Sequence, residues 1–109
     1  MVEIFHRIPY LPSITFESHA TINELDYQLV ARMNVETLGD AWNLSQNSNK
    51  EWIRIKEVES MVDVSSCRSS SIGDVFALDG QLHLIMVEGY KTIEWGDVAD
   101  FAAAFKPKV

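Results

Sequence analysis

Residues 25–35 read Leu-Asp-Tyr-Gln-Leu-Val-Ala-Arg-Met-Asn-Val, and this stretch decides the fold. Apolar side chains occupy every second position from Leu25 to Val35, and only Val30 interrupts the polar positions between them. Because successive side chains of a β-strand point to opposite faces, this alternation predicts a long strand with one buried side. Half-buried strands are typical of antiparallel sheets, so we expect this strand to lie near the centre of one.

Shorter stretches with the same alternation predict the other strands. Asp79-Gly80 marks a two-residue hairpin turn, because a type I′ turn needs positive φ at both positions. Strand character is found on both sides of this turn and elsewhere in the chain, in residues 2–8, 52–56, 74–78, 81–88 and 90–95. Residues 12–23 show no sustained periodicity and are interpreted as a long loop or a short edge hairpin.

A first helix is predicted over residues 37–47. Thr37 is suited to accept a backbone hydrogen bond as the N-cap, and Asp40 three residues later completes a pattern similar to a capping box. Leu38 and Trp42 then share one face at helical spacing. Trp42 is therefore interpreted as a core residue rather than a ligand-stacking one.

A second helix is predicted near the C-terminus, beginning at Asp97 and ending before Pro107. Asp97 is suited to the N-cap, and Asp100 to the first turn, where the helix dipole favours a carboxylate. The apolar residues that follow recur at i, i+3, i+4 and i+7, namely Val98, Phe101, Ala102 and Phe105.

Together these elements predict an α+β fold in a single small domain. The 109 residues and 12.4 kDa are enough for one hydrophobic core and too few for two. We expect a mainly antiparallel sheet of four to five strands with two helices packed on it. The domain is expected to cover residues 1–109, with an N-terminal strand and loop over 1–24 and the core over 25–105.

The chain is acidic, and this limits its partners. Asp and Glu number 16 against 9 Lys and Arg, which gives a net charge of −7 and a pI near 4.8. Binding to nucleic acid or to anionic lipid needs a local basic patch. The densest group of cations, Lys50, Arg54 and Lys56, is diluted by neighbouring Glu residues. We therefore expect neither direct nucleic-acid binding nor membrane binding.

Neither a metal site nor a cofactor is predicted. The three His residues, His6, His19 and His83, are far apart, and none lies near a second Cys or at i, i+4 spacing. The single Cys67 has no partner for an internal disulfide and is more readily a small buried side chain than a nucleophile. The chain has no apolar run long enough for a signal peptide or a membrane span, so we expect it in the cytoplasm.

The Ser-rich loop Arg68-Ser69-Ser70-Ser71 is the candidate binding site. Hydroxyls, backbone N–H groups and the guanidinium of Arg68 are groups that hold a phosphate or a carboxylate. In the alternative interpretation the serines cap local backbone, and Gly73-Asp74 turns the chain into the next strand. The loop has no G-x-S-x-G motif and no identifiable base, so a hydrolase is not supported.

Two segments resemble those of a known family. Ser45-Gln46-Asn47 is similar to a Thr-Gln-Asn helix end, and residues 68–74 are similar to the motif Arg-Ser-Thr-Ser-Val-Gly-Asp. Both motifs belong to small uncharacterised proteins of bacterial viruses and plasmids. Ser45 and Ser70 replace Thr, and Ile72 replaces Val. The resemblance covers about residues 25–93 and implies an origin in a phage or mobile element, and it carries over no catalytic residue.

Two classes of function are open. The first is a non-enzymatic protein that binds a host protein in the infected cell, as an inhibitor of nucleic-acid-dependent or defence machinery. The second is a small binding module for a nucleotide or other anion, with contacts from Arg68, Ser69, Ser70 and Ser71. An enzyme is not expected, and exposed strand edges near the N-terminus favour a homodimer.

Overall fold

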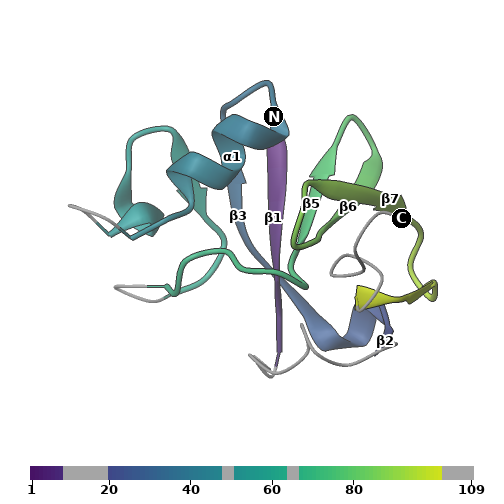
Figure 1. The fold of residues 1–109 in the computed structure, drawn as a ribbon. Coiled ribbons are helices and arrows are strands. Elements are labelled where there is room, and N and C mark those ends of the chain that lie inside the picture. The colour runs from purple at the N-terminus through teal and green to yellow at the C-terminus, as the bar shows by residue number, and fades with distance from the viewer. Residues whose placement is uncertain (9–19, 48–50, 64–66, 102–109) are drawn as a thin grey trace.

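The fold is built on a six-stranded antiparallel sheet (Figure 1). The computed structural model describes residues 1–8, 20–47, 51–63 and 67–101. From one edge to the other the sheet runs β4 (Val58–Ser60), β3 (Tyr27–Met33), β1 (Val2–Arg7), β5 (Val75–Leu78), β6 (Gln81–Ile85) and β7 (Tyr90–Ile93). A separate two-stranded sheet pairs β2 (Ala20–Thr21) with β8 (Val98–Ala99).

The α+β class is confirmed in coarse terms, but the numbers of elements differ from those predicted. The main sheet has six strands rather than four to five, and the described residues contain one α-helix, α1 (Leu38–Leu44), rather than two. The additional strand is β4, three residues long, which pairs with β3 in a region where the sequence alternates poorly. The predicted loop over 12–23 lies outside the described residues as far as residue 19.

The central strand is confirmed, although it is shorter than residues 25–35. Asn23 caps a 3₁₀ helix, η2 (Glu24–Asp26), which leaves Leu25 90% exposed. Within β3 the register on β1 jumps from Ala31 to Leu29, so Val30 forms a bulge. A bulge shifts the alternation by one residue. The sequence pattern places Leu29 and Ala31 on the same face, because they are two residues apart. The bulge turns them to opposite faces of the sheet.

Local turn and cap signals were predicted correctly. The Thr37 side chain accepts a hydrogen bond from the N–H of Asp40 and starts α1. Asp79 and Gly80 have φ of 53° and 78°, as the hairpin between β5 and β6 requires. These features depend on neighbouring residues only, which is why the sequence is sufficient to place them.

The short strand predicted at residues 52–56 is wrong. This segment begins with a 3₁₀ helix, η3 (Trp52–Arg54), closed by a hydrogen bond from the N–H of Ile55 to the C=O of Trp52. Trp52 and Ile53 are adjacent and both buried. A half-buried strand would bury only one of two neighbouring side chains, whereas the 3₁₀ turn buries both.

The C-terminal helix predicted from Asp97 is also wrong at its beginning. Residues 98–99 form β8, which pairs with β2. Next to this pairing, the N–H of Ile22 donates to the C=O of Asp97, and the C=O of Ile22 accepts from the N–H of Gly96. The side chain of Asp97 accepts from the N–H of Glu94 and closes a turn instead of capping a helix. Ala99 and Phe101 are both buried, and this i, i+2 spacing fits a strand as well as the predicted pattern fits a helix.

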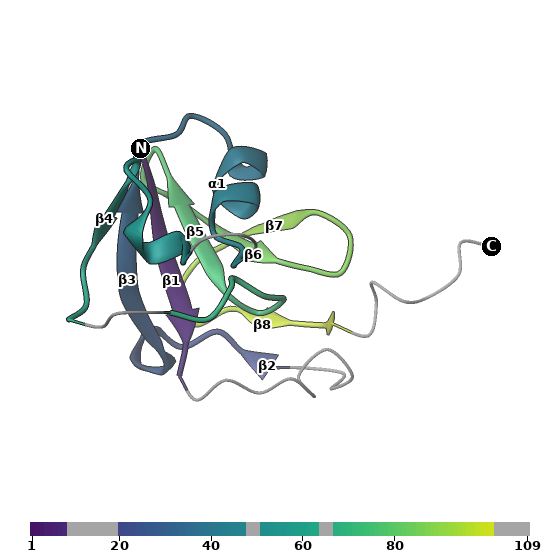
Figure 2. The same ribbon diagram turned by 90° about the vertical axis from the view of Figure 1, so that its left-hand side faces the viewer.

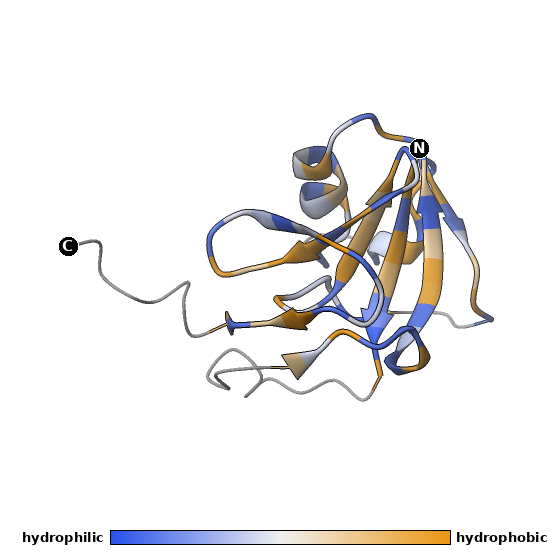
Figure 3. Ribbon diagram, turned by 90° about the vertical axis from the view of Figure 1, so that its right-hand side faces the viewer, coloured by the Kyte–Doolittle hydropathy of each residue, from blue (hydrophilic) through white to orange (hydrophobic). Residues whose placement is uncertain are grey.

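The sheet has an apolar cluster on each face. One cluster contains the inner residues of β1 and β3 with Trp52, Phe76 and Ile85, and Trp42 packs against it. The other contains Val75, Leu84 and Ile93 with Ile22 and Phe101. Figure 2 shows α1 beside β5, with which it is in contact, and β2 with β8 along the lower side of the sheet. Figure 3 shows apolar residues along the strands between them.

Candidate functional site

A buried ion pair joins the Ser-rich loop to the beginning of β5. Asp74 is 1% exposed and accepts hydrogen bonds from both terminal nitrogens of Arg68, at 2.6 and 2.7 Å. The same carboxylate accepts from the backbone N–H groups of Arg7 and Ser71, each at 2.8 Å. One cation and two backbone donors therefore compensate the buried charge of Asp74, in a two-pronged geometry that Lys does not reproduce.

His6 lies beside this pair and is buried in β1. Its Nε2 atom is 3.0 Å from the hydroxyl oxygen of Ser70 and 3.9 Å from a carboxylate oxygen of Asp74. Burial lowers the pKa of His6 to about 4, and it outweighs the opposite effect of Asp74, while Arg68 adds to the lowering. The imidazole is therefore neutral at pH 7, and the charge partner of Asp74 is Arg68.

Cys67 contacts the other ring nitrogen of His6, but its thiol is not activated. The distance from its sulfur to Nδ1 is 3.6 Å. Burial raises the pKa of the Cys67 thiol, and the opposite effect of Arg68 is smaller. A nucleophilic Cys–His pair needs a thiolate beside an imidazolium. Here both groups favour their neutral forms, so the contact is a weak hydrogen bond between neutral groups rather than a catalytic pair.

Residues 45–47 and the Ser-rich loop, the two motif segments of the sequence, lie against each other. The N–H of Ser70 donates to the C=O of Ser45 at 3.0 Å, and the side chain of Gln46 donates to the C=O of Ser70 at 3.2 Å. The N–H of Asn47 donates to the hydroxyl oxygen of Ser69 at 2.7 Å. The residues of one motif therefore fasten the loop of the other to the end of α1.

The four residues predicted to contact an anion are thus held by internal bonds. Arg68 binds Asp74, and Ser71 gives its N–H to the same carboxylate. Ser69 is bound to the end of α1, and Ser70 is 3% exposed against β1. Anion binding by the loop stays a prediction. The geometry corresponds to its alternative, in which the polar side chains of the loop satisfy local backbone and one another.

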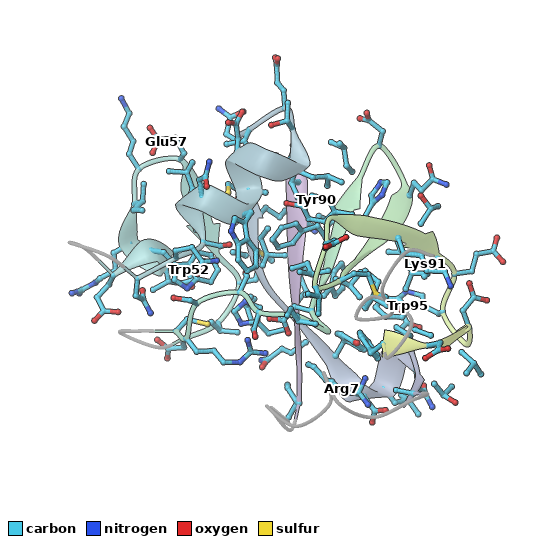
Figure 4. The ribbon with its side chains drawn as sticks, in the orientation of Figure 1. Arg7, Trp52, Glu57, Tyr90, Lys91 and Trp95 are labelled. Carbon is cyan, nitrogen blue, oxygen red and sulfur yellow. The ribbon has the colours of Figure 1, made fainter. Side chains whose placement is uncertain are left out.

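An apolar pocket of about 270 Å³ opens between α1 and the β6–β7 hairpin, and we call it the apolar pocket. Its lining is almost entirely apolar or aromatic: Trp42, Ile72, Ile85, Met86, Val87, Gly89 and Tyr90. The hydroxyl of Tyr90 donates to the C=O of Leu38 at 3.2 Å, which holds the ring beside α1 (Figure 4). Pockets with aromatic walls and little polar surface suit apolar groups.

A second hollow of about 600 Å³, here the acidic hollow, lies toward the other end of the β6–β7 pair. It is lined by residues of the hairpin turn, the strands and the segment after β7: Asp79, Gly80, Gln81, Leu82, Ile93, Glu94 and Trp95. The ring of Trp95 packs edge to face against the ring of Phe5, with the ring centroids 5.6 Å apart. It also packs against the ring of Tyr27, with the centroids 5.3 Å apart. Two carboxylates beside an indole suit a cationic group.

The pocket and the hollow open on opposite faces of the sheet. Tyr90 is paired with Ile85, which belongs to the cluster under α1. Ile93 is paired with Leu82, and both belong to or pack against the cluster on the other face. β7 lies between them and, among the described residues, is the last strand of the sheet.

Among the side chains of the described residues, no group of three or more His, Cys, Asp and Glu is placed to hold a metal ion. None of the helices in the described part of the chain combines the length and apolar character needed to cross a membrane.

Comparisons with protein-family models, with curated proteins and with solved structures find no match to this chain. The resemblance to proteins of bacterial viruses and plasmids therefore stays a prediction.

The apolar pocket was not predicted from the sequence. The helical spacing of Trp42 predicts a core residue, and Trp42 does pack against the core, but it also forms a wall of the pocket. The strand predicted over residues 81–88 ends at Ile85 in the structure, and Gly89, with φ of 75°, lies in the break between β6 and β7. This break marks a hairpin connection. It does not reveal that α1 lies across from it, because that contact joins residues far apart in the chain.

Proposed function

We propose that this protein is a non-enzymatic binding module that takes an apolar side chain of a partner protein into the apolar pocket. The single observation that carries the proposal is the pocket wall formed by Trp42 and Tyr90 at the surface of an acidic chain. Tyr90 is 37% exposed although its ring adjoins the core. Binding energy at protein interfaces is concentrated in aromatic and apolar contacts of this kind.

A host-cell protein is the partner that we propose, and the cytoplasm of the host is the place of binding. The motifs similar to those of bacterial viruses and plasmids support this choice. The net charge of −7 supports a partner with a basic surface, since complementary charge speeds encounter and selects partners. A basic surface that serves nucleic acid would be blocked by such binding, which is the inhibitory role that we propose.

The polar network supports a binding role rather than catalysis. Its most reactive side chain, Cys67, has a raised pKa beside the neutral imidazole of His6. The guanidinium of Arg68 is already bound to Asp74, so the loop gives the anion-binding alternative no additional support. These groups stabilise the scaffold that places α1 against β6 and β7.

Selection from a random peptide library displayed against the immobilised protein tests the proposal. We expect enriched peptides to share an apolar residue and to bind the Val87→Asp variant at least about tenfold more weakly. Val87 lines the apolar pocket outside both core clusters, so this change introduces a charge without removing core packing. Trp42→Ala is expected to have the same effect, with thermal unfolding measured to confirm that the variant is folded.

Leu25→Ala is the matched control, because Leu25 is apolar, 90% exposed and not part of the pocket lining. Its affinity for the enriched peptides is expected to equal that of the unchanged protein. The proposal is overturned if no peptide is enriched. It is also overturned if the enriched peptides bind folded Val87→Asp and Trp42→Ala proteins as tightly as the original.

A further inference from the structure

β7 is an edge strand with an accessible outer side. Among the described residues it pairs only with β6, and Tyr90, Lys91 and Thr92 are exposed. In an antiparallel sheet every second residue of an edge strand directs its N–H and C=O outward, where another strand can pair with them. The four residues of β7 therefore offer a short template, and side-chain pockets beside it are needed for affinity and specificity.

Such pockets exist on both faces of this edge. The apolar pocket adjoins Tyr90, the first residue of β7, and the acidic hollow adjoins Ile93, the last. Tyr90 and Ile93 are three positions apart and point to opposite faces, in agreement with the clusters that their partners on β6 contact. An added strand would present its own side chains alternately to these two faces.

The two pockets favour different side chains. The apolar pocket presents Trp42, Met86 and Tyr90. The acidic hollow presents Asp79 and Glu94 beside the indole of Trp95, which together favour Lys or Arg. Because the two pockets favour different side chains, they select the order of the apolar and the basic residue in a bound segment as well as the spacing between them.

We infer that β7 pairs with an extended segment of the partner that places an apolar side chain in the apolar pocket and a basic side chain, three positions along, in the acidic hollow. This inference rests on the proposed function, because the same apolar pocket receives the apolar side chain. It adds that the partner binds by extending the sheet. It also adds that the recognised segment carries an apolar and a basic residue at i and i+3.

Lys91 adds a further constraint. It is paired with Leu84 and therefore shares the face of the acidic hollow, two residues before Ile93. A basic residue of the guest segment directly opposite Lys91 would be repelled, whereas one opposite Ile93 meets the carboxylates of Asp79 and Glu94. Charge thus selects the position of the basic residue as well as its presence. Figure 4 shows Lys91 and Trp95 on the same side of β7.

The first test is the spacing in the peptides enriched from the random library. We expect an apolar and a basic residue three positions apart, and we expect Asp79→Lys with Glu94→Lys to remove the preference for the basic residue. Retention of the apolar preference in this double variant would show that the apolar pocket acts independently. Enriched peptides with no basic residue, or with the two residues an even number of positions apart, overturn the inference.

The second test is backbone methylation of one enriched peptide, made as a series with a single N-methyl group moved along the chain. Strand pairing predicts weaker binding, by about tenfold, at every second position, since alternate N–H groups face β7. Binding unaffected by methylation at any position would overturn strand pairing. If a peptide insensitive to methylation still failed to bind the Val87→Asp variant, the proposed function would stand and only strand pairing would be overturned. If the library gave no enriched peptide, both the proposed function and strand pairing would be overturned.

Discussion

The guanidinium of Arg68 binds both carboxylate oxygens of Asp74, at 2.6 and 2.7 Å, across a loop of only five residues. Asp74 is 1% exposed, and the side chain of Arg68 is 27% exposed. The pair also reaches β1, because the N–H of Arg7 donates to Asp74 and the C=O of Arg7 accepts from Arg68 at 3.3 Å. The Ser-rich loop is thus held to two strands through one buried charge.

Loss of the cation should therefore be costly. Arg68→Ala leaves the carboxylate of Asp74 buried without its charge partner, and we expect the free energy of unfolding to fall by about 3–5 kcal/mol. Arg68→Lys keeps the charge but loses the two-pronged geometry, so an intermediate loss is expected. Urea unfolding followed by Trp fluorescence measures both.

Arg32→Ala is the matched control, because Arg32 also binds a carboxylate, that of Glu3 at 3.1 Å, but both side chains are more than a third exposed. Its loss should cost no more than about 1 kcal/mol. Equal losses in Arg68→Ala and Arg32→Ala would contradict a structural role for the buried pair.

Features fixed by neighbouring residues were predictable, and features fixed by distant ones were not. The cap at Thr37 and the turn at Asp79-Gly80 were read correctly because each depends on about four consecutive residues. Val98 was assigned to a helix because its alternative, pairing with Thr21, joins segments at opposite ends of the chain. The sequence does not reveal the role of Asp74 in the candidate site for the same reason, since Arg7 and His6 reach it from the first strand.

Replacing Gly80 of the hairpin turn and Gly39 of α1 by Ala should change the free energy of unfolding in opposite directions. Gly80 has φ of 78°, so Gly80→Ala strains the backbone although nothing lies within 4 Å of the added carbon. We expect a loss of about 1–2 kcal/mol in the free energy of unfolding. Gly39 lies inside α1, has equal space and no positive φ. Gly39→Ala is expected to stabilise by roughly 0.5–1 kcal/mol.

Thermal and urea unfolding of the two Ala variants check this pair. Because the added methyl group meets no neighbour in either case, the difference isolates backbone conformation. A loss of stability in both variants would mean that the space around Gly39 is smaller than the structure indicates, and no loss at Gly80 would contradict the positive φ of the turn.

The thiol of Cys67 should react slowly in the folded protein. Burial raises its pKa, so the thiolate fraction at neutral pH is smaller than that of an ordinary thiol. We expect the rate of modification by a disulfide reagent at pH 7.5 to be at least about tenfold below that of glutathione. Full reactivity should return in denaturant. A folded-state rate above that of glutathione would instead identify an activated cysteine and reopen a catalytic role.

The neutral state of His6 predicts how stability depends on pH. In the unfolded chain His6 takes up a proton near pH 6.5, whereas in the folded protein burial lowers its pKa to about 4. Between these values the unfolded state binds more protons, so acidification favours unfolding. Stability from this group is complete above pH 6.5 and is lost as the pH falls toward 4, by about 3 kcal/mol in total at roughly 1.4 kcal/mol per pH unit.

Urea unfolding at several pH values between 8 and 4 measures this loss, with His6→Gln as the test variant, since Gln can still donate to the hydroxyl of Ser70. We expect the free energy of unfolding of His6→Gln to fall less steeply over this window than that of the unchanged protein, by up to about 1.4 kcal/mol per pH unit. His83→Gln controls for removal of a histidine elsewhere in the sheet. Parallel pH profiles for His6→Gln and the unchanged protein would contradict the lowered pKa of His6, because the imidazole would then take up its proton at the same pH in the folded and the unfolded state.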